Sequence, residues 1–405
     1  MVRIIEWSER REDMLPVFFV CEFLLQPSCP MEKLSQRCLD SGTRHPNFNC
    51  MLGKNLFYSN KVLFVYRVVN IRKRLGMSKL NLNISALKLV KTLSAEAEKY
   101  SVVVEKTESG ATLIDAGLEA DGGFLAGEII TEICLGGYGQ VKILPFQYGD
   151  VVLPSVYVQT DHPALSTLAS QFAGWQIKSG KFSAIGSGPA RALALKPKKL
   201  YQKLNYSEEA DTAVLVLETE KKPPEEAIQQ IAEKCRVSPE NLFLIAFSTT
   251  SLAGSIQVSG RIVETGLHKL EKLDLNPLIV KYAWGYAPII PLHPNSGEAM
   301  GRTNDAILYG GTANYTLEYE DDKKLENIVK QAPSTASKAM KEARELAAKN
   351  PRFLEIFKEA DFDFYKIDPN IFAPAIMVVN NIKTGKTFRA GNLDIEIMKE
   401  SLGLL

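Results

Sequence analysis

Residues 213–247 read AVLVLETEKKPPEEAIQQIAEKCRVSPENLFLIAF, and this stretch decides the fold class. Its two apolar runs, residues 213–217 and 242–247, have the length of buried strands. Between them, Pro223-Pro224-Glu225-Glu226 predicts the start of a helix that runs to about Cys235, because acidic side chains stabilise the positive end of a helix. The order strand, helix, strand predicts a fold that mixes helices with a sheet.

The spacing of apolar residues also predicts helices and strands before and after residues 213–247. Residues 83–100 repeat apolar side chains every three or four positions, which predicts an amphipathic helix. Further runs predict strands at residues 101–105, 111–115, 129–135, 151–160, 255–259 and 304–311. Pro154 predicts an edge or a bulge in its strand, and Gly127 predicts a break in the chain. Asp161 predicts the N-cap of a helix that ends near Phe172.

These elements predict an α+β (mixed α/β) fold with two lobes and a boundary near residues 195–210. We expect a first domain over residues 77–204 and a second over residues 205–405, with late segments able to return to the first. The stretch Lys196-Pro197-Lys198-Lys199 is interpreted as a solvated connector between them.

Composition limits the function classes. The 405 residues include 45% apolar and 23% charged residues, as in globular proteins. Lys and Arg total 48 and Asp and Glu total 47, so there is no basic excess for a nucleic-acid footprint. No apolar run approaches the roughly 18 residues of a membrane helix. We therefore expect neither a nucleic acid nor a membrane as partner.

The first 76 residues differ from the rest. They hold four of the six cysteines, and 12 basic against 7 acidic residues. Regular apolar spacing begins abruptly after Met77, which favours Met77 as the functional start and residues 1–76 as a non-native or disordered extension; a genuine extension is the alternative. The four cysteines form no C-x-x-C pair and are interpreted as free thiols. The body keeps only Cys134 and Cys235, which indicates a reducing, cytoplasmic compartment.

Common catalytic signatures are missing from the sequence. There is no P-loop, no G-x-S-x-G and no H-E-x-x-H. The body histidines, His162, His268 and His293, lack the spacing of metal ligands. We therefore expect no metal site.

Two glycine-flanked segments could carry chemistry. In Gly186-Ser187-Gly188-Pro189-Ala190-Arg191, a turn that opens a helix offers backbone N–H groups to an anion, and Arg191 adds a guanidinium. A plain strand-to-helix turn is the simpler interpretation. In Gly260-Arg261-Ile262-Val263-Glu264-Thr265-Gly266, a helix would place Arg261 and Glu264 on one face and a strand would separate them. A surface ion pair of little energetic weight is the simpler interpretation there.

Five strings in one order give the chain a resemblance to a known family. They are Thr131-Glu132-Ile133-Cys134-Leu135-Gly136-Gly137, Thr160-Asp161-His162-Pro163-Ala164, the string from Gly186 extended to Ala192-Leu193, the string Gly260 to Gly266, and Asp363-Phe364-Tyr365-Lys366-Ile367-Asp368. From Met77 onward, over about 329 of the 405 residues, the chain resembles the methenyltetrahydromethanopterin cyclohydrolases. The first 76 residues depart from the family pattern.

The resemblance implies two related α+β domains with a substrate pocket between them, assembled as a homotrimer. It implies reversible hydrolysis of N5,N10-methenyltetrahydromethanopterin to the N5-formyl form in one-carbon metabolism, with no metal or organic cofactor. The substrate is an amidinium-like cation whose methenyl carbon is already electron-poor. Glu264 matches the family's catalytic Glu, which would act as base and then acid, and Arg261 matches its partner Arg.

Charge and the resemblance together suggest contacts for the pterin and its anionic tail. The expected substrate-binding residues are Lys178, Ser179, Lys181, Gly186, Ser187, Gly188 and Arg191. Trp175 is interpreted as a core residue rather than a stacking platform. Glu132 is the next carboxylate to consider should Glu264 not be the base.

Other functions remain open at this point. The Gly186–Arg191 turn could instead bind a phosphate or nucleotide, and a non-catalytic relative could bind a pterin or a protein partner. The presence of both Arg261 and Glu264 argues against a mere binding module. The folate version of the reaction usually belongs to Rossmann-type chains, and no G-x-G-x-x-G is present.

Overall fold

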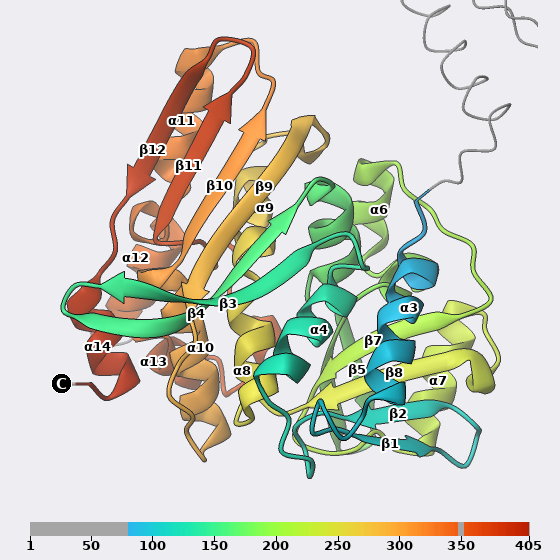
Figure 1. The fold of residues 1–405 in the computed structure, drawn as a ribbon. Coiled ribbons are helices and arrows are strands. Elements are labelled where there is room, and N and C mark those ends of the chain that lie inside the picture. The colour runs from blue at the N-terminus through green and yellow to red at the C-terminus, as the bar shows by residue number, and fades with distance from the viewer. Residues whose placement is uncertain (1–79, 347–351, 405) are drawn as a thin grey trace, which may run out of the picture. The chain divides into compact units, whose positions relative to one another are not determined.

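The computed structural model describes residues 80–346 and 352–404. The expectations for residues 1–76 lie outside this range. Residues Ser78–Leu405 form one compact unit, and none of its described helices is both long enough and apolar enough to cross a bilayer. The α+β class expected from the sequence is confirmed, because two six-stranded sheets are combined with helices (Figure 1).

The first sheet has the order β1-β2-β8-β7-β6-β5. Its strands are β1 (Val103–Lys106), β2 (Thr112–Asp115), β5 (Trp175–Ser179), β6 (Phe182–Ser187), β7 (Ala213–Glu218) and β8 (Leu242–Phe247). Strands β7 and β8 are parallel and joined by α7 (Glu225–Cys235), as residues 213–247 predict. Pro224 caps α7, and Glu225 and Glu226 lie in its first turn.

The second sheet has the order β12-β11-β10-β9-β4-β3. Its strands are β3 (Gln140–Tyr148), β4 (Val151–Thr160), β9 (Val280–Pro288), β10 (Thr312–Leu317), β11 (Ile376–Asn381) and β12 (Lys386–Gly391). Both sheets take strands from either side of residues 204/205, so a boundary there does not separate the two sheets.

The helices fill the space around the sheets. The α-helices besides α7 are α3 (Leu82–Ala95), α4 (Phe124–Cys134), α5 (Ala190–Ala194), α6 (Lys198–Leu204), α8 (Leu252–Ser259), α9 (Ile262–Lys272), α10 (Ser296–Gly310), α11 (Asp322–Gln331), α12 (Lys338–Leu346), α13 (Phe353–Glu359) and α14 (Ile395–Leu402). A π-helix, η1 (Ala164–Gln171), and the 3-10 turns η2 (Pro239–Asn241), η3 (Pro277–Ile279), η4 (Ser334–Ala336) and η5 (Phe364–Lys366) complete the set.

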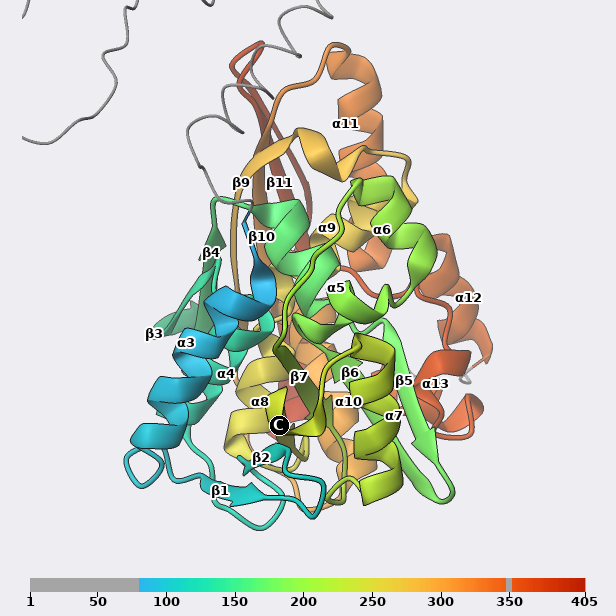
Figure 2. The same ribbon diagram turned by 90° about the vertical axis from the view of Figure 1, so that its right-hand side faces the viewer.

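Apolar clusters hold these layers together. One face of the first sheet packs against α3, α4 and α8, and its other face packs against α5 and α7. Trp175 belongs to the second of these clusters, which confirms it as a core residue. The second sheet buries one face against η1, α9 and α11, and Figure 2 shows α9 and α11 on one side of it.

Three predicted strands are wrong: residues 129–135 lie mostly in α4, residues 255–259 in α8, and residues 304–310 in α10. These helix segments are buried almost all round, and in α8 even the polar side chains of Ser255, Gln257 and Ser259 are buried, so the polar positions do not mark the helical period. The expected break at Gly127 is also wrong. Gly127 lies within α4, where a Cβ atom would come within 2.6 Å of Ile256 Cβ, so glycine lets α4 and α8 pack closely.

Local details also differ around β4 and η1. Pro154 is on neither an edge strand nor a recorded bulge, because β4 pairs with both β3 and β9. It is tolerated because it faces Pro145 of β3 and the ladder to β9 begins only at Ser155. Asp161 is not the N-cap of the following helix, since η1 begins at Ala164 after Pro163.

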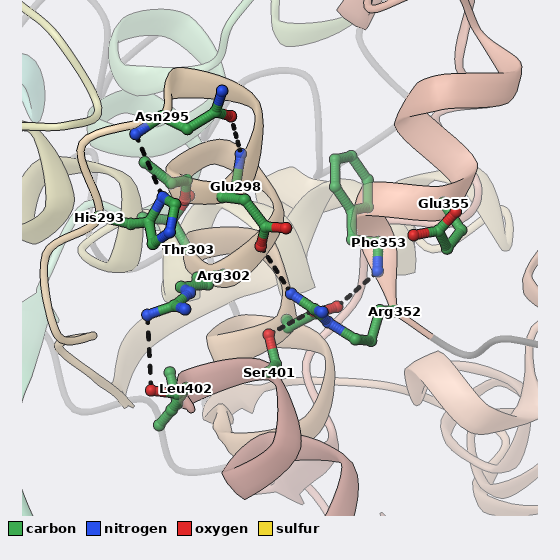
Figure 3. A network of polar contacts seen from close by, with 12 residues as sticks. His293, Asn295, Glu298, Arg302, Thr303, Arg352, Phe353, Glu355, Ser401 and Leu402 are labelled. Carbon is green, nitrogen blue, oxygen red and sulfur yellow. Dashed lines mark hydrogen bonds and ion pairs between the residues drawn. The ribbon is translucent and has the colours of Figure 1, made fainter. Parts of the chain in front are cut away.

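A polar network fixes α10, which carries several residues of the site described below (Figure 3). Arg352 Nη2 donates to Glu298 Oε2 over 2.9 Å. The buried Asp305 accepts from Phe353 N over 2.8 Å and from Ser401 Oγ over 2.6 Å. These contacts tie α10 to α13 and α14, so the position of α10 depends on the C-terminal helices.

Candidate active site

A cavity of about 290 Å³ opens among the ends of β6 and β7, the helices α8, α9 and α10, and the segment 364–372. Its walls are mostly apolar, and three phenyl rings line it: Phe172, Phe364 and Phe372. Arg261, Glu264 and Glu218 are the acidic and strongly basic residues of the wall. A flat, largely apolar ligand with one polar centre fits such a site.

Arg261 and Glu264 form a buried ion pair. Arg261 Nη2 donates to Glu264 Oε2 over 2.7 Å, and the two side chains are only 11% and 5% exposed. The alternative of a surface ion pair is therefore wrong. A buried pair that faces a cavity is held in a low-dielectric setting, where each charge acts strongly on its partner and on a ligand.

The local sequence places this pair. Helix α8 ends at Ser259, Gly260 follows, and Arg261 is the N-cap of α9 with Glu264 in its first turn. The three-residue spacing on a helical turn brings both side chains to one face, as the sequence analysis anticipated for a helix. Gly260 is required because a Cβ atom there would lie 2.6 Å from Thr131 Cγ2 of α4.

Burial and neighbouring charges set the protonation of the pair. Burial raises the pKa of Glu264, and the nearby charges of Arg261 and Arg191 lower it less strongly, so its pKa lies above the ordinary value. Burial alone would lower the pKa of Arg261, but chiefly the charge of Glu264 raises it. Glu264 is therefore more basic than an exposed carboxylate, which suits a group that must accept a proton.

Arg191 is fully buried, and its charge lowers the pKa of Glu264. Its Nη1 donates to the carbonyls of Leu168 (3.2 Å) and Ser170 (2.7 Å). Its Nη2 has no hydrogen-bond partner among the described residues and lies against Gly174, which lines the cavity. Arg191 thus supplies positive charge to the site, and substrate contact by this residue stays a prediction.

The other residues of the turn are also buried. Gly188 N donates to Ser170 O over 2.9 Å, and Ser187 Oγ accepts from Cys134 Sγ over 3.4 Å. Gly186 belongs to β6, and the helix after the turn, α5, has five residues. Since the turn is enclosed and Gly188 N–H is already engaged, the geometry gives no support to a phosphate site there.

Lys178, Ser179 and Lys181 do not line the cavity beside Arg261. Ser179 Oγ donates to Glu226 over 2.6 Å, and Lys181 is exposed between β5 and β6. Lys178 is exposed and lies 3.9 Å from Asp363. It lines a second, more polar cavity of about 590 Å³ that shares wall residues with the first.

Sequence reasoning missed several wall residues. His268 lies one helical turn after Glu264 on α9, a spacing that could have placed it at the site. Burial lowers the pKa of His268 to about 4, so its imidazole is neutral near pH 7. Tyr365 lies in a string already quoted for the family resemblance. Glu218 lies at the end of an apolar strand, and nothing in the sequence around it indicates a role in the site.

Glu132 lies away from both cavities. Its carboxylate accepts from Val141 N over 3.0 Å and joins α4 to β3. In the part of the chain that the structure describes, no group of three His, Cys, Asp or Glu side chains is arranged to hold a metal ion.

The chain is similar to known proteins over most of its length. A family model described as "Cyclohydrolase (MCH)" matches residues 81–402. A relative from Methanothermobacter marburgensis is 46% identical over 327 residues, which cover 80% of this chain and 99% of the relative. One from Methanocaldococcus jannaschii is 45% identical over 327 residues (80% and 98%). One from Methanosarcina mazei is 41% identical over 309 residues (76% and 94%). All three are named methenyltetrahydromethanopterin cyclohydrolase.

Proposed function

Because this chain belongs to the methenyltetrahydromethanopterin cyclohydrolase family, we propose that Glu264, held by Arg261, is the base with which it opens the ring of its cationic substrate. The reaction is the reversible hydrolysis of N5,N10-methenyltetrahydromethanopterin to the N5-formyl form, a step of methanopterin-linked one-carbon metabolism. The observation that carries the catalytic assignment is the buried Arg261–Glu264 pair in the wall of a mostly apolar cavity.

The first step is addition of water to the methenyl carbon. A water oxygen forms the new C–O bond while Glu264 takes one of its protons, and the positive charge of the amidinium is lost. Arg261 fixes the carboxylate through its 2.7 Å contact and keeps it ionised until the proton arrives. Because Arg261 repels the cation, we place Glu264 between Arg261 and the methenyl carbon.

The second step breaks the bond between the former methenyl carbon and N10. N10 receives the proton that Glu264 holds, the hydroxyl of the adduct gives its proton to the freed carboxylate, and the formyl group stays on N5. One proton then leaves to solvent, which balances the conversion of a cation and water into a neutral formyl group. One carboxylate thus serves first as base and then as acid.

A direct test follows the loss of methenyl absorbance when purified protein is added to methenyltetrahydromethanopterin, with and without EDTA. We expect the same rate after exhaustive chelation, because the substrate carbon carries its own positive charge and needs no Lewis acid. Activity that vanishes with EDTA and returns with zinc would contradict this mechanism. A protein stabilised by ATP but unaffected by the pterin would contradict the function.

The remaining assignments concern the surroundings of the reaction. Lys178, in the wall of the polar cavity, is the predicted tail contact that the geometry supports best. The buried free thiols of Cys134 and Cys235 support a cytoplasmic location.

The quaternary structure proposed is a homotrimer. The face of the second sheet turned away from α9 and α11 carries the aromatic side chains of Tyr157, Trp284 and Tyr286, beside an exposed Tyr282. Aromatic side chains are enriched in protein interfaces, so this face supports self-association. Light scattering on the purified chain should give three times the monomer mass; a monomer at micromolar concentration would contradict the proposal.

A further inference from the structure

Glu218 lies where the two cavities of the site meet. It is the last residue of β7, at the carboxyl end of the parallel pair β7–β8, where ligands of such sheets commonly bind. It lines both the apolar cavity that holds Arg261 and Glu264 and the polar cavity that holds Lys178. A ligand that extends from one cavity into the other must pass its side chain.

The carboxylate of Glu218 has no cation of its own. Thr249 Oγ1 donates to Glu218 Oε1 over 2.7 Å. Within residues 80–346 and 352–404, no Lys or Arg lies within ion-pair distance of it. Burial raises the pKa of Glu218, and the hydrogen bond from Thr249 and the charge of Arg261, whose guanidinium is engaged by Glu264, lower it less strongly. A carboxylate in a low-dielectric wall without a counter-ion favours a cationic ligand.

The substrate supplies the missing cation. Its amidinium is positive, whereas the formyl product is neutral at the same atoms and has the same pterin and the same tail. We propose that Glu218 is the counter-ion of this amidinium and selects the methenyl form over the formyl form. The proposal rests on the proposed function, since it concerns the substrate of that reaction.

Glu264 and Glu218 have different roles, because only Glu264 is neutralised by a cation of the protein. Glu264 is already neutralised by Arg261, so it can accept a proton without being the main attraction for the cation. Glu218 supplies that attraction. Glu220 and Asp363 also lie in the wall of the polar cavity, but Asp363 faces Lys178 and Glu220 is exposed to solvent. Glu218 alone lines both cavities among these acids.

This role has a kinetic signature. Water addition removes the positive charge, so contact with Glu218 stabilises the bound substrate more than the transition state of hydrolysis. Its loss should raise the KM for the methenyl form with little decrease in the kcat of hydrolysis. The reverse reaction creates the cation, so its kcat should decrease. A structural role would lower both rates together.

The decisive experiment measures binding without turnover. In a Glu264→Gln background, the dissociation constants of the methenyl and formyl forms are compared with and without Glu218→Gln. Asp322→Asn is the matched control, because Asp322 also accepts from a hydroxyl, that of Thr384 at 2.9 Å, but lines neither cavity.

We expect Glu218→Gln to weaken binding of the methenyl form about 10- to 100-fold, the usual weight of a charged contact. Binding of the formyl form and all constants of the Asp322→Asn control should stay within about twofold. An equal loss for both forms would assign Glu218 to the pterin itself and overturn the proposal. No loss for either form would overturn it as well.

A second variant covers the case in which Glu218→Gln does not fold. Thr249→Val removes the hydroxyl that orients the carboxylate of Glu218. It should weaken binding of the methenyl form more than binding of the formyl form, and equal effects on both would overturn the proposal. Failure of the proposed function looks different, since the unaltered chain would then convert no methenyl substrate. If the unaltered chain is active but its preference for the methenyl form does not depend on Glu218, only the present inference is wrong.

Discussion

The Glu264→Gln variant is expected to hydrolyse the methenyl substrate about 10²–10⁴ times more slowly than the unaltered chain, because a positioned general base contributes that much. Stopped or continuous measurement of methenyl absorbance gives kcat and KM. In the unaltered chain the rate falls as pH decreases through the pKa of Glu264, which burial raises above the ordinary value. The variant should lack this acidic limb, since its amide does not titrate.

Stability must be measured beside the rate. Glu264 is 4% exposed, so its replacement leaves a buried Arg261 without a countercharge. The amide oxygen of Gln still accepts from the guanidinium, so we expect a loss of about 1–3 kcal/mol rather than collapse of the fold. A near-normal kcat, or an unchanged acidic limb, would remove Glu264 as the base. Glu218 would then be the carboxylate to test before Glu132, which lies outside both cavities.

The Arg261→Lys variant is expected to lose about 10- to 100-fold in kcat, the weight of a charge-assisted hydrogen bond, with little change in KM. Lys keeps the positive charge but lacks the planar group that fixes a carboxylate. The weaker contact leaves burial less opposed, so the pKa of Glu264 rises and the acidic limb moves to higher pH. The pH profile of kcat measures this shift.

Arg389→Lys is the matched control for that variant, because Arg389 is exposed on β12 and lines neither cavity. It should keep the kcat, the KM and the pH profile of the unaltered chain. An Arg261→Lys variant that behaved like this control would show that the guanidinium geometry is unimportant and that only its charge matters.

The sequence predicts best where one face of an element is polar or where turns mark its ends. Helix α7 follows from Pro224 and its acidic first turn, and β7 and β8 follow from their bounded apolar runs. Helices α4 and α8 are not recognisable in this way, because their polar side chains face other parts of the protein. Glu128 and Glu132 of α4 accept hydrogen bonds from β3, and the polar side chains of α8 are buried. Such helices are recognised only once their neighbours are known, as at Gly127, whose contact with Ile256 joins them.

The residues of the site also fall into those that the sequence predicts and those that it does not. Arg261 and Glu264 could be predicted because they lie in one short string whose spacing has a meaning on a helix. Glu218 and Tyr365 could not be assembled with them, since they come from segments about 150 residues apart and meet only through the fold. The sequence predicts Arg191 as a site residue, but it does not predict that Arg191 is buried, because a glycine-rich turn is usually found at the surface.

Strands of the two sheets alternate along the chain, and this order affects how the protein folds during its synthesis. On the ribosome, the β1–β2 hairpin emerges well before its neighbour, since Thr112 pairs with Phe243. The β3–β4 hairpin likewise waits for β9, which begins only at Val280. Pairings this distant slow folding and leave apolar strand edges open in the meantime. We therefore expect the nascent chain to expose these strand edges until β9 has been made, and a premature stop before β8 would leave both hairpins without their neighbouring strands.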